Sequence, residues 1–341
     1  MWHNVVSKAR FAIITHMKQK NIIIGAIIIG LAIMGRVATA PPRMIDVHEH
    51  VQSEDQLKVL IPAMKKHNVK TVFLLGTPME TILLNGQKTF TKYDENNAEI
   101  LKIANRDPNR FKAFCTIDPR DPKKLVKLKQ CMLSGGTGLK LYNGNGFFYD
   151  TFKTPLDSRS MFSIYDYAER EGVPIIFHVN GGKYLNEFES VLNRFPNLKI
   201  NVPHFMLLSS RPNQLIRIFD KYPNLYTDTS FGFIDFTVQG FERFSKQSNL
   251  YRELIEKYAD RILFATDEVL TNTDGKEADY MKKRLKCYRD FLEKEKYRCP
   301  LVDEWYRQKG QEPPEAYSGM NLGKEVLKKI YRENPQRFLE D

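Results

Sequence analysis

Two histidines separated by one residue begin the part of the sequence that could carry chemistry. His48 and His50 lie in a strand-like run, RMIDVHEHV, at 43–51. Because side chains alternate between the two faces of a strand, both imidazoles are expected to project from the same face. Three more side chains that can bind a metal follow in later runs of the same kind: His178, His204 and Asp267. Imidazole nitrogens with a carboxylate, and one position left open to water, are the ligands of a catalytic divalent cation.

The elements that carry these residues alternate between short β-branched runs and amphipathic segments from residue 43 onward. We expect strands at 43–51, 69–76, 110–118, 136–143, 173–179, 198–205, 224–230 and 261–268. We expect helices between them, for example at 54–67, 94–106, 123–134, 160–171, 184–195, 211–221 and 243–259. Eight such strand–helix units predict an α/β fold, a (β/α)8 TIM barrel of the metal-dependent hydrolase type. An open doubly wound sheet is the alternative, but it would need a glycine-rich first turn, which this sequence lacks.

In a barrel, the five candidate ligands fall at the C-terminal ends of their strands, where active sites of this fold assemble. Two long connections, 144–158 and 269–278, follow the fourth and eighth strands and are candidate substrate lids. Residues 297–320 are predicted to be irregular, and a closing helix is expected at 321–332, ending at Asn334-Pro335.

Six short motifs together resemble those of one enzyme family. They are IDVHEH (45–50), GLKLYNG (138–144), PIIFH (174–178), PH (203–204), NLYTDTS (224–230) and RILFATD (261–267). They are similar to motifs of the amidohydrolase superfamily, and in particular of amidohydrolase family 2, which contains carboxymuconate-type decarboxylases and lactone hydrolases. The similarity runs from about residue 43 to the final helix. It implies a TIM barrel with a divalent metal site. We expect one ion, Zn, and a bridged two-metal site is the alternative.

The resemblance also implies roles for individual residues. The expected metal ligands are His48, His50, His178 and Asp267. Asp267 and His204 are the expected catalytic residues, with His204 positioning or deprotonating the attacking water or polarising the substrate.

Three more residues are candidates for substrate binding. Lys140 stands where some relatives carry a carbamylated, metal-bridging lysine; we expect it to be unmodified and to contact an anionic substrate. Arg120 could bind a substrate carboxylate or be a solvated loop residue. Tyr142 could form a wall of an aromatic pocket or only pack its loop onto the barrel.

The sequence departs from the family pattern around these residues. Phe205 follows His204 where relatives often have glycine, Tyr142-Asn143 replaces a common His-Pro, and Glu268-Val269 follows Asp267 where x-Pro is common. The ligands are retained while their surroundings differ, so the family does not define the substrate.

From these residues we expect hydrolysis of a small anionic ester, lactone or amide by metal-activated water. The alternative is non-oxidative decarboxylation of an aromatic or muconate-like acid. A third hypothesis, an exported binding protein without activity, is disfavoured because the full ligand set is present. The expected partner is a small-molecule substrate, and a homo-oligomer is left open. The net charge is +11, but five basic and no acidic residues lie in 1–40, and the rest is too weakly basic to predict nucleic-acid binding.

The N-terminal residues predict export. Residues 22–35 are uninterruptedly apolar, a basic stretch precedes them, and Ala38-Thr39-Ala40 offers a cleavage site. Fourteen helical residues rise about 21 Å, which is short of a ~30 Å hydrocarbon core. We therefore expect residues 1–40 to be a signal peptide or membrane anchor, and 41–341 to be a barrel in the periplasm or outside the cell. Contact with the membrane would be through the N-terminal segment only, and a buried core helix is the remaining alternative.

The four cysteines form no CxxC pair, which argues against a structural zinc site. Cys115 lies in an apolar run and is expected to be a small buried hydrophobic residue. Cys287 and Cys299 are close enough in sequence to form a disulfide in an exported protein, or they could be two free thiols.

Overall fold

A computed structural model describes residues 43–78 and 90–340 of the chain. The predicted export segment at 1–40 lies outside the described residues. Within the described ranges, no helix combines the length and the apolar character needed to cross a membrane.

The strands form one parallel sheet, and all eight predicted strands are present in it. In the described residues the sheet consists of β1 (Met44–Val51), β2 (Val69–Leu75), β3 (Phe111–Thr116), β4 (Gly138–Gly144), β5 (Ile175–Val179), β6 (Ile200–Val202), β7 (Leu225–Asp228), β8 (Ile262–Leu263) and β9 (Glu268–Leu270). Their order is β8-β7-β6-β5-β4-β3-β2-β1-β9. The predicted eighth strand is thus divided into β8 and β9, and the connection expected from 269 begins only after Leu270.

The sheet closes on itself because β8 pairs with β7 while β9 pairs with β1. Between these two short strands, the Val47 amide donates to the Phe264 carbonyl at 3.0 Å, and the Asp267 amide donates to the His48 carbonyl at 2.8 Å. These bonds join the first and eighth strand positions. The predicted TIM barrel is confirmed.

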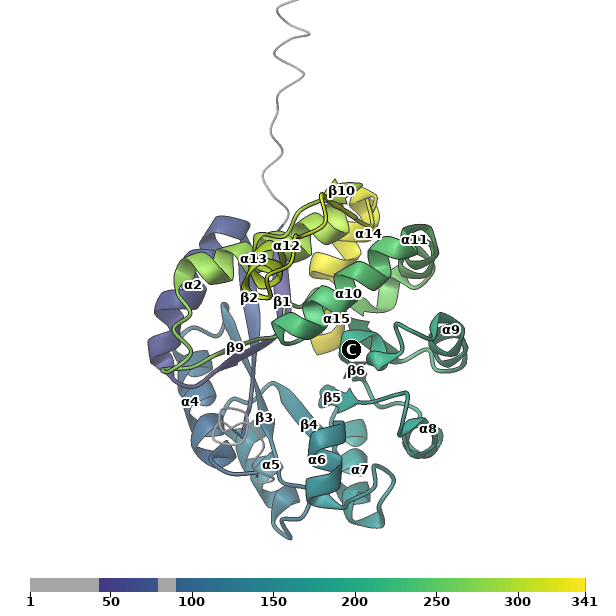
Figure 1. Ribbon diagram of the computed structural model, residues 1–341. Helices are drawn as coiled ribbons and strands as arrows, with labels where there is room; N and C mark the ends of the chain where they lie inside the picture. The colour runs from purple at the N-terminus through teal and green to yellow at the C-terminus, as the bar shows by residue number, and fades with distance from the viewer. Residues whose placement is uncertain (1–42, 79–89, 341) are drawn as a thin grey trace, which may run out of the picture. The chain divides into compact units, whose positions relative to one another are not determined.

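Helices surround the strands, as Figure 1 shows. They are α2 (Leu57–His67), α4 (Tyr93–Arg106), α5 (Lys124–Leu133), α6 (Gly146–Phe152), α7 (Phe162–Arg170), α8 (Leu185–Arg194), α9 (Pro212–Lys221), α10 (Ile234–Lys246), α11 (Ser248–Lys257), α12 (Ala278–Glu293), α13 (Pro300–Gln308), α14 (Lys324–Lys328) and α15 (Asn334–Glu340).

Two predicted helices and the stretch predicted to be irregular differ from the structure. The helix expected at 243–259 is two helices, α10 and α11, and α10 begins nine residues earlier than predicted. The stretch 297–320 contains α13 and a short antiparallel pair, β10 (Lys296–Tyr297) with β11 (Tyr317–Ser318). The closing helix does not end at Asn334-Pro335: the chain stays helical from α14 through a π-helical turn at Lys329–Glu333 into α15, which contains Pro335.

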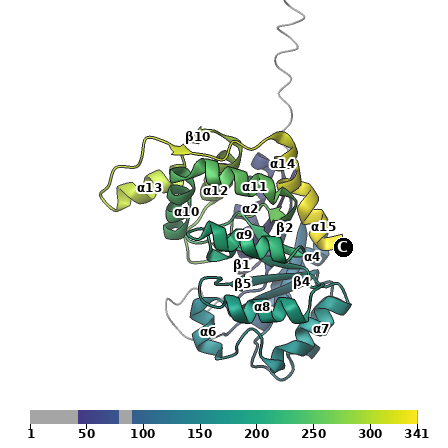
Figure 2. The same ribbon diagram turned by 90° about the vertical axis from the view of Figure 1, so that its right-hand side faces the viewer.

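Buried apolar side chains fill the barrel interior. Ile45, Val47, Phe73 and Phe114 belong to this cluster, and Phe338 of α15 joins them from outside the sheet. The Phe338 ring lies 5.3 Å from that of Tyr226 between centroids. In Figure 2, α15 lies on one side and both α6 and α10 lie on the other. One end of the barrel is therefore covered by α15, which leaves the opposite end for a site.

Strand β1 contains an irregularity that matters for the site. Its pairing with β2 shifts in register between Asp46 and Glu49. Strict alternation would place Val47 and His48 on opposite faces. Instead Val47 packs in the barrel interior and His48 lines the cavity described below. A β-bulge, which adds one residue to a strand and redirects side chains, accounts for this arrangement.

Both cysteine pairs are disulfides. Cys287 is bonded to Cys299, and Cys115 is bonded to Cys131. The first pair is one of the two outcomes expected from the sequence. The expectation that Cys115 is only a small hydrophobic residue is wrong, because α5 places Cys131 beside β3, with 6.5 Å between the two Cα atoms.

Candidate functional site

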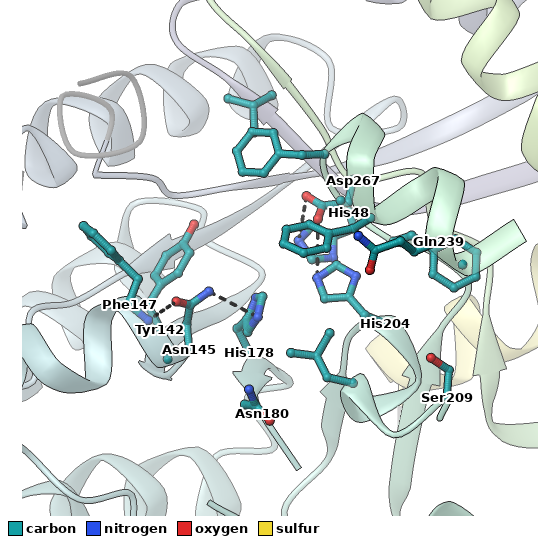
Figure 3. Close-up of a pocket in the computed structure, with 18 of the residues that line it drawn as sticks. His48, Tyr142, Asn145, Phe147, His178, Asn180, His204, Ser209, Gln239 and Asp267 are labelled. Atoms are coloured by element: carbon teal, nitrogen blue, oxygen red, sulfur yellow. Dashed lines mark hydrogen bonds and ion pairs between the residues drawn. The ribbon is translucent and has the colours of Figure 1, made fainter. Parts of the chain in front are cut away.

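A cavity of about 650 Å³ opens at the carboxyl ends of the barrel strands. All five candidate metal-binding residues line it: His48, His50, His178, His204 and Asp267. Figure 3 shows His48 and Asp267 together, with His204 and His178 turned toward the same space. The convergence predicted from the strand ends is therefore present.

Three of these residues form a tight group. His48, His50 and Asp267 each offer one ligand atom, and these atoms lie within 4.8 Å of one another. The Asp267 Oδ1 atom lies 3.3 Å from His48 Nε2 and 3.2 Å from His50 Nε2. Two imidazole nitrogens and a carboxylate oxygen thus meet at one point.

The Nδ1 atoms of His48 and His50 each form a hydrogen bond with a neighbouring side chain. His48 Nδ1 lies 3.2 Å from Asp228 Oδ2, a buried carboxylate that can only accept. His50 Nδ1 lies 2.7 Å from Thr77 Oγ1, whose own proton is donated to the Leu75 carbonyl. Both Nδ1 atoms are therefore donors, which leaves both Nε2 lone pairs facing Asp267. This is the tautomer that a metal-binding imidazole needs, so the residues fit a divalent cation.

Burial and neighbouring charges oppose each other in setting the pKa of each of these groups. Burial lowers the pKa of His48 to about 4, although Asp267 opposes the shift, and burial also lowers the pKa of His50. Burial alone would raise the pKa of Asp267, but His48, His50 and His204 lower it well below the ordinary value. The group thus holds neutral imidazoles around an ionised carboxylate, which are the protonation states of metal ligands.

His204 lies just past the end of its strand. The strand β6 ends at Val202, and residues 204–207 form a turn, η3 (His204–Leu207), in which all four have φ between 52° and 60°. Such a run of left-handed, non-glycine residues is strained. The turn directs His204 Nε2 to 3.4 Å from Asp267 Oδ2, while Nδ1 lies 2.9 Å from Ser230 Oγ. The sequence predicted a strand through 205, so the strained turn is a correction.

His178 lines the cavity but lies outside the three-residue group. Its Nε2 atom is 3.2 Å from the Asn145 side-chain nitrogen, and its ring centroid is 5.0 Å from that of His204. Its role as a metal ligand stays a prediction.

Lys140 and Tyr142 both line the cavity from β4. Lys140 Nζ is fully buried, 3.2 Å from His48 Nε2, and burial lowers its pKa to about 8 although Asp267 and Asp228 favour the charged form. Tyr142 donates its hydroxyl to the Gly76 carbonyl at 3.0 Å. Tyr142 can therefore form a wall of the cavity, while Lys140 adds positive charge beside the histidines.

Arg120 is not brought to the cavity. It is exposed, pairs with Asp118 at 2.6 Å and lies over the Phe152 ring. The arginine that lines the cavity is instead Arg243 of α10. Sequence reasoning missed this residue and also Gln239, which lines the cavity from the same helix. Both residues were missed because the helix was predicted to begin only at residue 243, whereas α10 begins at Ile234. The apolar residues Phe233, Phe241 and Phe244, at helical spacing, were a signal for the earlier start.

The two connections that were expected to be substrate lids differ in how much of the cavity they line. The one after β4 forms α6, and Gly146, Phe147 and Phe148 line the cavity. From the predicted 269–278 connection only Val269 does so, as part of β9.

Asp228 supports a prediction about metal affinity. Its buried carboxylate accepts from His48, from the Asn201 amide and from the backbone of His204. We expect Asp228→Asn to weaken binding of a divalent cation about 10- to 100-fold, because the amide group no longer fixes the His48 tautomer. Competition with a chelating dye measures this effect, and Asp220→Asn, on the exposed face of α9, is the control. Equal affinity in the two variants would contradict the role of Asp228.

Comparison with known proteins gives one family match. The model of a family described as Amidohydrolase matches residues 45–340. No curated protein matches the sequence.

Solved structures give the same fold at low sequence identity. The chain is similar to an uncharacterised TIM-barrel protein from Bordetella bronchiseptica, with 17% identity, a TM-score of 0.55, and coverage of 87% of this chain and 98% of that one. It is also similar to a putative 2-pyrone-4,6-dicarboxylic acid hydrolase from Pseudomonas putida, at 10% identity and TM-score 0.55, covering 87% and 97%. A third similar structure is 4-oxalomesaconate hydratase from Rhodopseudomonas palustris, at 15% identity and TM-score 0.51, covering 87% and 95%.

Proposed function

Since this chain belongs to the amidohydrolase family of metal-dependent hydrolases and decarboxylases, we propose that it hydrolyses a small anionic ester, lactone or amide. The observation that carries the proposal is the group of His48, His50 and Asp267, whose three ligand atoms meet within 4.8 Å inside a cavity. We propose that this group holds one Zn ion, with His178 as our predicted fourth ligand.

A divalent cation at this position would polarise the substrate carbonyl and make a water molecule easier to deprotonate. Asp267 Oδ2 faces away from His48 and His50, toward His204, and is the oxygen that accepts the proton of the attacking water. His204 is fixed through Nδ1 by Ser230, so its Nε2 atom is presented to the same space. There it orients the water or donates to the oxygen on which charge develops.

An anionic substrate is favoured by the charges of the cavity. Asp267 is the only acidic side chain among the described residues that line it, whereas Lys140 is buried beside His48. A cation on the His48–His50–Asp267 group would add further positive charge. An anionic substrate would therefore be attracted into the cavity before the reaction begins.

Metal analysis and product analysis test the proposal. The purified protein should bind one divalent cation per chain, and a chelator should remove both the metal and the activity. A panel of lactones, aryl esters and aryl carboxylates should then be incubated in ¹⁸O-labelled water. Incorporation of one ¹⁸O into the product supports hydrolysis. Release of carbon dioxide with no ¹⁸O in the organic product would instead identify the decarboxylation that the sequence leaves open, and a protein that binds no metal would overturn both.

We also propose that the barrel acts outside the cytoplasm. The apolar run at 22–35 and the Ala38-Thr39-Ala40 site support export, and two disulfides suit an oxidising compartment. Fractionation of cells followed by N-terminal sequencing tests this. A mature protein that begins at Pro41 indicates a cleaved signal, a membrane-bound protein that retains residues 22–35 indicates an anchor, and a cytoplasmic protein with its first residues intact refutes export.

A further inference from the structure

Arg243 faces the cavity with part of its guanidinium unused. Its Nη1 atom donates to Ser209 Oγ at 2.8 Å, and Ser209 is itself buried. Across residues 43–78 and 90–340, no carboxylate lies within 4.0 Å of the Arg243 guanidinium, and its bond to Ser209 is the one hydrogen bond that it forms. A half-buried guanidinium that is held by a neutral serine keeps free donors for an anion, and a carboxylate is the group that its planar fork fits best.

Exposed apolar side chains gather at the same cavity. Phe147 of α6, Leu207 of η3, and Phe233 and Phe236 at the start of α10 all line it, and their exposed fractions run from 38% to 57%. Elsewhere in the described chain, only Val126 and Leu133 are large hydrophobic residues of comparable exposure. We call these four residues the apolar rim. Exposed apolar side chains that cluster around a concave site mark a surface that a ligand covers.

The two cations of the cavity have different neighbours. Lys140 is buried next to His48, at the proposed metal group, whereas Arg243 is held by Ser209. In Figure 3, Ser209 lies on the opposite side of His204 from Tyr142 and Asn145. Two cations with separate neighbours in one cavity suit a ligand that has two polar ends.

We propose that the substrate is an amphipathic carboxylate, in which an apolar chain or ring joins the reacting carbonyl to a carboxylate bound by Arg243. The apolar rim covers the body of the molecule, and Ser209 positions the guanidinium. This inference rests on the proposed function for the identity of the reacting end. The carboxylate subsite itself requires no turnover, so it can be tested separately.

Binding to the metal-free protein is the test, because a bound cation would also attract carboxylates. The probes are 3-phenylpropionate and its neutral analogue 3-phenylpropionamide, with affinities measured by calorimetry. We expect the carboxylate to bind about 10- to 100-fold more tightly than the amide, as a charge-assisted hydrogen bond allows. Arg243→Gln should remove this preference, and Arg243→Lys should restore part of it. Acetate, which lacks the apolar body, should bind far more weakly than 3-phenylpropionate.

Two control variants decide between Arg243 and other cations. Arg211→Gln changes an exposed arginine that does not line the cavity and should keep the full preference. Lys140→Met tests whether the buried lysine, and not Arg243, gives the preference. If both probes bind equally to the unaltered protein, or if the preference survives in Arg243→Gln but is lost in Lys140→Met, the inference is overturned. If the protein binds metal and hydrolyses esters but does not prefer 3-phenylpropionate over the amide, only the Arg243 subsite is refuted.

If it prefers 3-phenylpropionate but binds no metal, only the proposed function is refuted.

Discussion

Replacing Asp267 by asparagine should reduce turnover by about 10³-fold or more while leaving the barrel folded. The side chain contacts His48 and His50 through Oδ1 and His204 through Oδ2, at 3.2 to 3.4 Å. Asparagine keeps the size and shape of the side chain but carries no negative charge. It is therefore a poor ligand for a divalent cation and cannot accept a proton from water.

Two measurements separate this effect from misfolding. The Asp267→Asn protein should keep its circular dichroism spectrum and should lose metal, as measured by elemental analysis after gel filtration. Asp220→Asn makes the same chemical change on an exposed helix and should retain both metal and turnover. If Asp267→Asn retained near-normal turnover of any substrate found for the protein, the mechanism proposed above would be wrong.

Much of the fold and the position of the site could be predicted from the sequence, because both depend on local pattern. Strand periods placed His48 and His50 on one face, and parallel strands bring their carboxyl ends to one edge. The five candidate ligands therefore met in the cavity as expected. The register shift in β1 between Asp46 and Glu49, which brings His48 to the cavity, was not predicted.

The features that sequence reasoning missed depend on tertiary contacts. The pairing of Cys115 with Cys131 exists because α5 packs against β3, which no spacing rule reveals. The left-handed turn at His204 is held by bonds such as that from the Gly181 amide to the Met206 carbonyl, from a different part of the chain. Propensity alone argues against four consecutive non-glycine residues in this conformation.

Arg243 was missed for a different reason. A helix boundary misplaced by nine residues left this arginine at the start of the predicted helix, and Arg120 was chosen because it follows a strand end. Both arginines suit an anion by residue type, but only the structure shows that Asp118 already neutralises Arg120.

Removing the Arg284 guanidinium should destabilise the protein by about 3–5 kcal/mol, the usual cost of breaking a buried ion pair from one side. Arg284, on α12, is 1% exposed and pairs with Glu268 at 2.9 Å. It also donates to the carbonyls of Thr266, Asp267 and Gly232. In Arg284→Met, these three carbonyls lose their donor and the buried Glu268 loses a partner.

The consequence should extend to the metal group, because Asp267 has a left-handed backbone with φ of 49°. Such a conformation persists only where surrounding contacts enforce it, and the bond from Arg284 to the Asp267 carbonyl, 3.0 Å long, is one of them. We therefore expect Arg284→Met to lower Tm by several degrees and also to weaken metal binding. Lysine cannot reach three carbonyls with one ammonium group, so Arg284→Lys should give an intermediate result.

Lys283→Met, one position away on α12, provides the matched control. Lys283 forms an exposed pair with Asp279 one turn earlier, so its removal should change Tm little and metal affinity not at all. Differential scanning fluorimetry and chelator competition on the three variants measure both effects. If Arg284→Met lowered Tm but bound metal as tightly as Lys283→Met, Arg284 would support only the fold. If it changed neither Tm nor metal affinity, the hydrogen bonds from Arg284 to the segment between β8 and β9 would not stabilise the protein or its metal group.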